Sequence, residues 1–146
     1  MKKIVMVTGA TSGIGRACAL KFGKAGYRVI ITGRRPNALA ELSTELADAG
    51  VGSLVLGLDV RDRKMAELSV KSLPQDWREI DVLVNNAGLA LGLEPEYEGD
   101  FDDWDTMIDT NIKGLLTMTR LIVPGMVRRN RGQVINIGSV AGDAAY

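Results

Sequence analysis

The 146-residue sequence contains no histidine and a single cysteine, Cys18. The absence of histidine excludes imidazole catalysis and histidine metal ligands within this chain. One cysteine forms no internal disulfide, and without a second cysteine or any histidine we expect no metal site. Cys18 lies in a helical pattern and is predicted to be part of the core. Its single occurrence fits a reducing compartment, and we expect a cytoplasmic protein.

Long hydrophobic runs and an excess of charge of one sign are also missing. The apolar run at residues 4–7 stops at Thr8 and is too short for the hydrophobic region of a signal peptide. No segment approaches the roughly 18 apolar residues of a membrane span. Eighteen basic residues balance eighteen acidic ones, so we expect neither nucleic acid nor a membrane as a partner. The length and the hydrophobic share of 46% fit one folded domain with a core.

Short apolar runs alternate with helical patterns along the chain. Five short runs are mainly apolar, with Gly57 in the third and Asn136 in the last, as is typical of strands covered on both faces: residues 4–7, 29–31, 54–58, 82–84 and 134–137. Helical patterns fill the intervals, at residues 15–26, 36–50, 63–71 and 103–129. This order predicts an α/β fold, a Rossmann-like doubly wound parallel sheet of five strands in the order 3-2-1-4-5, with right-handed crossovers.

The apolar faces of two helices can be predicted from their spacing. In the first helix the apolar positions are Ile14, Cys18, Phe22 and Ala25. In the longest helix they are Trp104, Ile108, Ile112, Leu115 and Ile122. Pro124 is expected to bend this helix or to mark its last turns. The acidic residues at positions 100–105 resemble a cation site, but we interpret them as a solvated helix N-terminus.

A glycine-rich turn follows the first strand and opens the first helix. Such a turn allows the backbone to approach a pyrophosphate, and the helix N-terminus directs free N–H groups at it. The spacing is Gly-x-x-x-Gly-x-Gly, and the alternative is a tight connection without a ligand. The candidate cofactor-binding residues of this turn are Gly9, Ala10, Thr11, Ser12, Gly13, Ile14 and Gly15.

Two arginines, Arg34 and Arg35, follow Gly33 at the end of the second run. Enzymes that prefer NAD carry an acidic residue near this position to bind the ribose 2′-hydroxyl. Glycine in its place, followed by arginines that pair well with phosphate, favours NADP as the cofactor. The alternative is a solvated basic pair before the next helix.

Four motifs in chain order resemble those of the short-chain dehydrogenase/reductase family. They are the turn Thr-Gly-x-x-x-Gly-x-Gly at residues 8–15, Asn-Asn-Ala-Gly at 85–88, Asn111 on the long helix, and Ser139 after the last strand. Together they cover the whole chain. Within the family, residues 85–95 and 104–114 are most similar to bacterial NADP-dependent 3-hydroxy acid (serine-type) dehydrogenases.

The resemblance implies a role for each remaining candidate. Asp59 and Val60 would meet the adenine, although Asp59 as the N-terminal cap of the next helix is the alternative. Asn86, Ala87 and Gly88 would lie against the cofactor ribose and brace the central strands. Ser139 would hydrogen-bond the substrate carbonyl, the alternative being a small loop residue. Asn111 would hold a water of the proton relay, the alternative being a satisfied polar residue in a helix.

The resemblance therefore implies an oxidoreductase that transfers a hydride between NADP and a small secondary alcohol or carbonyl, with a 3-hydroxy acid as the candidate substrate, and that forms homo-oligomers. The family's proton donor is a Tyr followed four residues later by a Lys, and this chain carries no such pair. We interpret Tyr146 as a residue of the preceding loop, and residues 1–146 as a dinucleotide-binding domain truncated before that motif. Two alternatives remain: a catalytically incomplete nucleotide-binding fragment, and a sugar-nucleotide epimerase, whose usual Gly-x-x-Gly-x-x-Gly turn differs.

Overall fold

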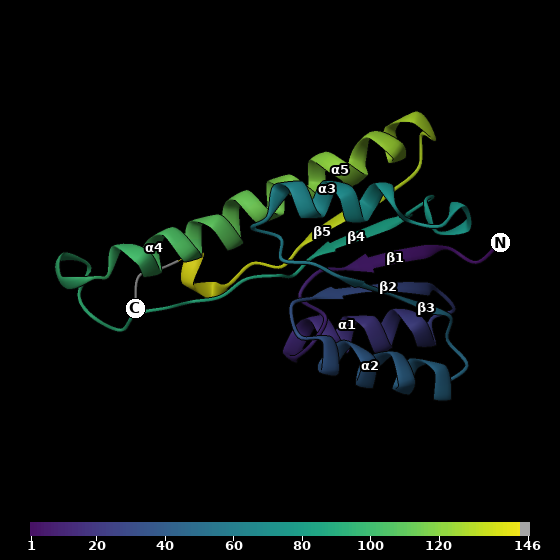
Figure 1. Ribbon diagram of the computed structural model, residues 1–146, viewed down its shortest axis with the longest axis horizontal. Coiled ribbons are helices and arrows are strands. Elements are labelled where there is room, and N and C mark those ends of the chain that lie inside the picture. The colour runs from purple at the N-terminus through teal and green to yellow at the C-terminus, as the bar shows by residue number, and fades with distance from the viewer. Residues whose placement is uncertain (144–146) are drawn as a thin grey trace.

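One parallel sheet of five strands forms the centre of the computed structural model, which describes residues 1–143 (Figure 1). The strands are β1 (Ile4–Val7), β2 (Arg28–Gly33), β3 (Ser53–Gly57), β4 (Val82–Asn85) and β5 (Gln133–Asn136). Their order is β3-β2-β1-β4-β5, which confirms the predicted order. Each strand lies within two residues of its predicted run. The central strands β1, β2 and β4 are buried almost throughout, as expected for strands covered on both faces, whereas the edge strands β3 and β5 are half-buried or exposed.

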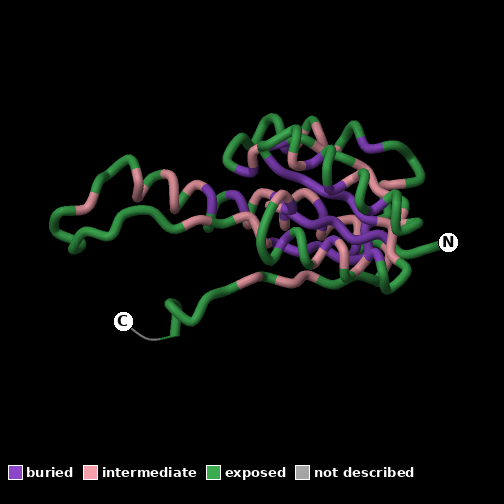
Figure 2. Tube along the Cα trace, turned by 90° about the horizontal axis from the view of Figure 1, so that it is seen from below, coloured by how far each residue is buried: buried purple, intermediate pink, exposed green. Residues whose placement is uncertain are grey.

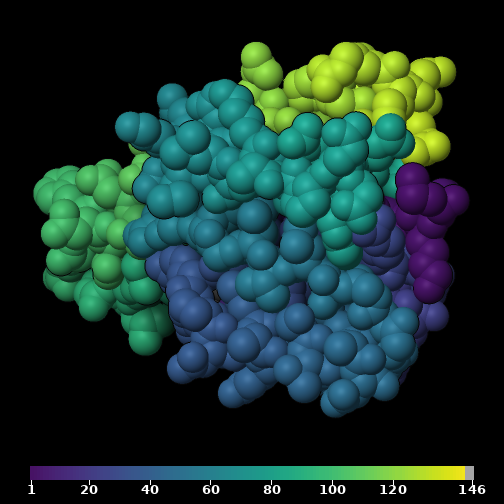
Figure 3. Space-filling view, turned by 45° about the vertical axis from the view of Figure 1, so that its right-hand side comes forward, coloured from purple at the N-terminus to yellow at the C-terminus, as the bar shows by residue number. Residues whose placement is uncertain are grey.

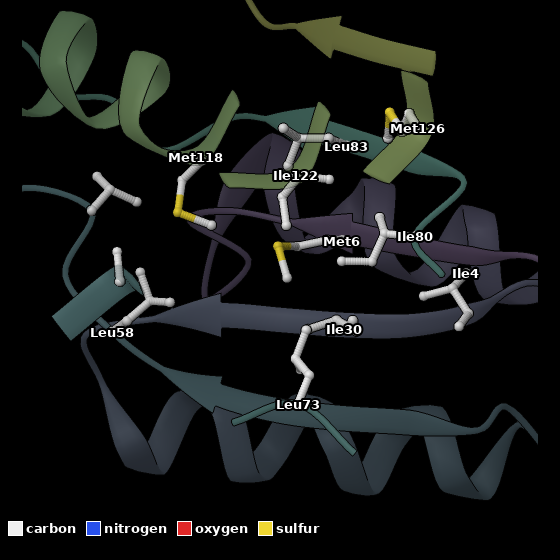
Figure 4. Close-up of a cluster of buried hydrophobic side chains, with 12 residues drawn as sticks. Ile4, Met6, Ile30, Leu58, Leu73, Ile80, Leu83, Met118, Ile122 and Met126 are labelled. Carbon is white, nitrogen blue, oxygen red and sulfur yellow. The ribbon is translucent and has the colours of Figure 1, made fainter. Parts of the chain in front are cut away.

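Helices cover both faces of the sheet. They are α1 (Gly13–Lys24), α2 (Pro36–Asp48), α3 (Arg63–Lys71) and α5 (Leu115–Arg128). Figure 1 shows α1 and α2 on one face, and α3 and α5 on the other. Alternate residues of β1 therefore enter different cores, with Val5 in the core that α1 and α2 cover and Met6 in the other. Figure 4 shows Met6 below Met118 and Ile122 of α5.

The buried face of α1 is displaced by one residue along the sequence from the predicted face. Gly15, Ala19 and Gly23 are buried, whereas Ile14 is 60% exposed and Ala25 is also exposed. Cys18 and Phe22 are half-buried at the edge of the core. The reason is close packing, since a Cβ at Gly23 would lie 2.9 Å from Val51 Cγ1. The residues of α1 that contact the core are small, and a prediction based on large apolar side chains does not detect them.

The long helical segment consists of α4 (Phe101–Ile108), a π-helical segment (Asp109–Gly114) and α5. Its buried residues recur at every fourth position: Thr110, Gly114, Met118, Ile122 and Met126. The predicted apolar face is correct at Ile122 but wrong at Ile108 and Ile112, which are 45% and 55% exposed. A π-helical turn holds more residues than an α-helical one, so the buried face departs from the 3.6-residue spacing.

The segment around α4 projects from one end of the molecule (Figures 2 and 3). Asp100 caps α4, because its carboxylate accepts hydrogen bonds from the N–H groups of Asp102 at 2.7 Å and Asp103 at 3.4 Å. The acidic residues here thus belong to a helix N-terminus, as predicted. Within residues 1–143, no helix is both long enough and apolar enough to cross a membrane.

Candidate functional site

A cavity of about 810 Å³ lies at the carboxyl ends of the strands, where parallel sheets of this type bind ligands. The candidate residues that line it are Gly9, Thr11, Ser12, Ile14, Arg34, Arg35, Asp59, Val60, Asn86, Ala87, Gly88, Asn111 and Ser139. Three candidates of the glycine turn lie outside its wall: Ala10 and Gly15, which are buried, and Gly13. The fold thus brings together motifs that are up to about 130 residues apart in sequence.

The glycine turn and the Asn-Asn-Ala-Gly motif are bound to each other by hydrogen bonds. The N–H groups of Asn86 and Ala87 both donate to Thr8 Oγ1 at 3.0 Å. In return, Asn86 Nδ2 donates to the carbonyl oxygens of Thr8 at 3.1 Å and Gly9 at 3.0 Å. A Cβ at Gly9 would lie 2.8 Å from Ala87 Cα. Glycine at this position therefore permits the close approach that the bonds require.

The N-terminus of α1 carries no side-chain cap. Ser12 is the N-cap residue, yet its side chain makes no capping hydrogen bond. The first N–H groups of a helix have no acceptor within the helix, and Ser12 and Ile14 line the cavity beside them. Gly13 has a φ of +55°, and no atom lies within 4 Å of the point that a Cβ there would occupy. This end of α1 therefore offers free donors and open space to an anion.

The arginine pair lies on the wall of the same cavity as the glycine turn. Arg34 and Arg35 are exposed residues between β2 and α2, and both line the cavity. Arg35 Nη2 donates a hydrogen bond of 2.8 Å to Thr11 Oγ1. The turn after β1 and the end of β2 are thereby joined through side chains at the cavity wall.

Asp59 forms an ion pair with Arg61 and does not cap a helix. The carboxylate accepts hydrogen bonds from Arg61 Nη2 at 2.7 Å and from the Arg61 N–H at 3.0 Å. The side-chain bond from Arg61 lowers the pKa of Asp59 below its ordinary value, against partial burial, and the charge of Arg34 adds to the lowering. The alternative of Asp59 as a helix cap is wrong, because Asp62 caps α3 by accepting the Met65 N–H at 2.9 Å.

Asn111 and Ser139 lie on the wall of the same cavity. Both side-chain atoms of Asn111 bond to the backbone of Leu89: Oδ1 accepts from its N–H at 2.9 Å and Nδ2 donates to its carbonyl at 2.8 Å. The interpretation of Asn111 as a satisfied polar residue thus holds for its side chain. Ser139 Oγ accepts the Ala141 N–H at 3.2 Å, which leaves the hydroxyl hydrogen free to donate. Tyr146 lies outside the described residues.

Several lining residues were not among the candidate site residues, Thr32, Asn85 and Met107 being three of them. Met107 precedes Asn111 by one helical turn, and Asn85 opens the Asn-Asn-Ala-Gly motif. The sequence spacing could therefore have predicted that both residues line the cavity. Asn85 Nδ2 donates to Thr119 Oγ1 and Asn136 Oδ1, each at 3.0 Å, and thereby joins β4 to α5 and β5.

Comparison with known proteins finds dehydrogenases and a reductase among the relatives of this chain. The sequence is 57% identical over 143 residues to an NADP-dependent 3-hydroxy acid dehydrogenase of Salmonella typhi, a match that covers 98% of this chain and 56% of the relative. It is 47% identical over 147 residues to sulfoacetaldehyde reductase 2 of Chromohalobacter salexigens, covering 100% of this chain and 58% of that protein. The chain thus spans little more than half the length of these relatives.

The fold has a close counterpart among solved structures. The closed form of serine dehydrogenase complexed with NADP+ matches with a TM-score of 0.93 and 53% sequence identity, over 98% of this chain and 56% of that one. The model of the short chain dehydrogenase family matches residues 3–146, which is nearly the whole sequence. The chain therefore belongs to the short chain dehydrogenase family.

Proposed function

We propose that the whole protein transfers a hydride between NADP and a small secondary alcohol or its carbonyl, with residues 1–146 as its dinucleotide-binding part. The observation that carries this proposal is the shared cavity. It combines an uncapped helix N-terminus and two arginines with a serine hydroxyl, Ser139, that is free to donate. The named activities of the relatives support the same reaction class.

The first turn of α1 fits the diphosphate of a dinucleotide. Its N–H groups are free of side-chain caps, and the space over Gly13 is open. A phosphate there would gain backbone hydrogen bonds and the favourable end of the helix dipole. We propose that Ser12, Gly13 and Ile14 hold the diphosphate, while Asn86 keeps the turn in place through its bonds to Thr8 and Gly9.

The arginine pair fits a 2′-phosphate. Within residues 1–143, neither Arg34 nor Arg35 forms an ion pair with a carboxylate. Arg34 acts on the Asp59 carboxylate only through its charge, so both guanidinium groups remain available to pair with a phosphate at the wall of the cavity. Because Gly33 stands where an acidic residue would bind a free ribose hydroxyl, we propose NADP rather than NAD. The name of the NADP-dependent relative supports this choice.

At the other end of the cavity we assign the carbonyl-binding role to Ser139. Its Oγ already accepts the Ala141 N–H, which orients the lone pairs and leaves the proton to a substrate oxygen. Asn111 fixes the backbone at Leu89 and so positions the loop that follows Gly88. Bound NADP would supply the hydride chemistry, and these residues would place the substrate carbon beside it.

The substrate class we propose is a 3-hydroxy acid or the corresponding 3-oxo acid. The two named relatives act on related molecules, since a 3-hydroxy acid and sulfoacetaldehyde both carry an acid group one carbon away from the reacting carbon. This shared feature makes an acidic substrate of that length the first choice for an assay.

We further propose that the whole protein is a cytoplasmic homo-oligomer. Ile108, Ile112 and Leu116 form an exposed apolar stripe at helical spacing, and they are 45%, 55% and 59% exposed. A stripe of this kind marks an association surface. Cys18 is a free thiol, which fits a reducing compartment. Sedimentation of the whole protein would test the assembly, and Ile112→Glu should shift it toward the monomer.

Titration calorimetry with NADP+ and NAD+ tests the cofactor assignment on the 146-residue chain. We expect NADP+ to bind roughly ten- to a hundredfold more tightly, the value of one charge-assisted phosphate contact. For the whole protein, NADPH oxidation with 3-oxo acids and sulfoacetaldehyde tests the reaction. Equal affinities for the two cofactors would contradict the NADP assignment. Tight binding without turnover by the whole protein would favour a non-catalytic nucleotide-binding role.

A further inference from the structure

We propose that Thr11 is a specificity-determining residue for NADP over NAD. Its hydroxyl positions Arg35, and its methyl group occupies the space that an acidic side chain at position 33 would need. The inference rests on the proposed binding of NADP and assigns to Thr11 a role in selecting it.

The hydroxyl acts through a hydrogen bond. Arg35 Nη2 donates to Thr11 Oγ1 at 2.8 Å, a bond between residues 24 positions apart in sequence. An arginine side chain has several rotatable bonds, and a guanidinium that is already held loses less freedom when it binds a phosphate. The bond uses one N–H of the group, and the remaining N–H donors stay available at the wall of the cavity.

The methyl group acts through exclusion. A Cβ at Gly33 would lie 2.6 Å from Thr11 Cγ2, but 3.6 Å from Leu39 Cδ2 and 3.8 Å from Thr11 Cβ. The last two are ordinary contacts, so among the three atoms nearest to such a Cβ only the methyl group lies too close. Gly33 ends β2 and is paired with Gly57 of β3, so its backbone is in a strand conformation that other residues readily adopt.

One torsion angle links the two effects. The methyl group and the hydroxyl of threonine both branch from Cβ, and χ1 sets the position of both. A rotation that moved the methyl group away from Gly33 would also withdraw Oγ1 from Arg35. The Thr11 side chain that holds Arg35 therefore also excludes an acidic side chain at position 33. In this cavity, recognition of the 2′-phosphate by Arg35 and recognition of the ribose 2′-hydroxyl by an acidic residue are mutually exclusive.

Valine and serine separate the two effects at position 11. Thr11→Val keeps the branched shape and removes the hydroxyl, whereas Thr11→Ser keeps the hydroxyl and removes the methyl group. The probes are 2′,5′-ADP, which carries the 2′-phosphate, and 5′-AMP, which does not. Calorimetric titration of the 146-residue chain with both probes measures the preference for the 2′-phosphate directly. The same titration of Arg35→Ala measures the preference that remains when the guanidinium is absent.

We expect Thr11→Val to weaken 2′,5′-ADP binding about tenfold while 5′-AMP binding changes less than about twofold. Thr11→Ser should retain the wild-type preference, and in the Arg35→Ala background Thr11→Val should have no further effect. A wild-type preference in Thr11→Val, or a stronger one, would overturn the role of the hydroxyl. Equal binding of the two probes to the wild-type chain would instead overturn the NADP proposal itself.

Gly33→Asp tests the methyl group. In the wild-type background we expect this change to leave 5′-AMP affinity no better than wild type and to lower the melting temperature. In Thr11→Ser the same change should be accommodated, and 5′-AMP affinity should rise about tenfold over that of Gly33→Asp alone. If the two backgrounds respond alike in both affinity and melting temperature, the methyl group excludes nothing and this part of the proposal fails.

Discussion

Two of the three glycines in the turn after β1, Gly9 and Gly13, have a positive φ but differ in their surroundings. At Gly9, where φ is +61°, a Cβ would in addition meet Ala87 Cα at 2.8 Å, so glycine here also permits close packing. At Gly13 nothing lies within 4 Å, and the backbone itself requires glycine because φ is +55°. The spacing Gly-x-x-x-Gly-x-Gly predicted a nucleotide turn without distinguishing these roles, because contacts with a segment about 75 residues later are invisible in the local sequence.

Gly13→Val is expected to abolish dinucleotide binding and to leave the secondary structure largely intact. A branched residue at positive φ costs on the order of 1–2 kcal/mol, and its side chain would fill the open space at the N-terminus of α1. Calorimetry measures the affinity and circular dichroism the fold. Gly26→Val is the matched control, since Gly26 also has a positive φ of 93° and open space around it, but lies beyond the other end of α1. Equal losses of affinity in both variants would mean that strain, rather than the site, is responsible.

Arg34→Ala combined with Arg35→Ala should remove the preference for NADP+. Each charge-assisted contact to the 2′-phosphate is worth about 1.5–3 kcal/mol, so NADP+ affinity should fall at least tenfold while NAD+ affinity stays nearly constant. Calorimetric titration with both cofactors measures the ratio. Arg128→Ala provides the control, because Arg128 is an exposed arginine at the end of α5. Unchanged NADP+ affinity in the double variant would show that the arginines do not meet the phosphate.

At the scale of elements, the sequence predicted all five strands and failed on two helix faces. The three central strands β1, β2 and β4 are buried almost throughout, and their apolar runs are a direct consequence, whereas the edge strands β3 and β5 are half-buried or exposed. The helix faces depend on small residues such as Gly23 and Gly114, whose contribution is close approach rather than hydrophobicity. A Cβ at Gly114 would lie 2.6 Å from Val60 Cγ2. A hydrophobic pattern records large side chains, and so it assigned the exposed Ile108 and Ile112 to the core.

Asp81 joins the amino ends of three strands, and its removal should destabilise the fold. Its buried carboxylate accepts the Ile4 N–H at 2.9 Å and contacts Arg131 Nε at 2.8 Å, while its backbone carbonyl accepts the Gln133 N–H. Asp81→Ala leaves the buried Ile4 N–H without its side-chain acceptor, at a cost of about 1–3 kcal/mol, whereas Arg131 is 56% exposed and can be hydrated, so the melting temperature should fall by roughly 2–12 °C. Thermal unfolding measures the change.

An exposed ion pair provides the control for Asp81→Ala. Arg16 and Glu45 pair between α1 and α2 with side chains that are 44% and 45% exposed. Exposed pairs contribute about 0–1 kcal/mol, so Glu45→Ala should change the melting temperature by only a few degrees. Comparable shifts in the two variants would mean that burial of Asp81 adds nothing to the stability of the sheet.

At the scale of the whole molecule, the position of the site was predictable and its internal contacts were not. Motifs that follow strands of a parallel sheet must meet at one edge, and this rule alone brought together Arg34, Asn86 and Ser139. The bond between Arg35 and Thr11, and the two bonds of Asn111 to Leu89, depend on side-chain directions that the sequence pattern does not contain. The pairing of Asp59 with Arg61 was missed for the same reason.

The 146 residues do not contain the Tyr-x-x-x-Lys pair that the family resemblance implies as the proton donor in catalysis. Within this sequence no tyrosine is followed four residues later by lysine, and Ser139 and Asn111 do not readily release a proton at neutral pH. General acid–base assistance is worth about 10²–10⁴-fold. We therefore expect the chain to bind NADP and yet to oxidise NADPH with small 3-oxo acids at least about a hundredfold more slowly than the whole protein, measured by the ultraviolet absorbance of NADPH. Turnover equal to that of the whole protein and lost in Tyr146→Phe would identify Tyr146 as the proton donor. Equal turnover that survives that substitution would mean that the reaction does not depend on these residues.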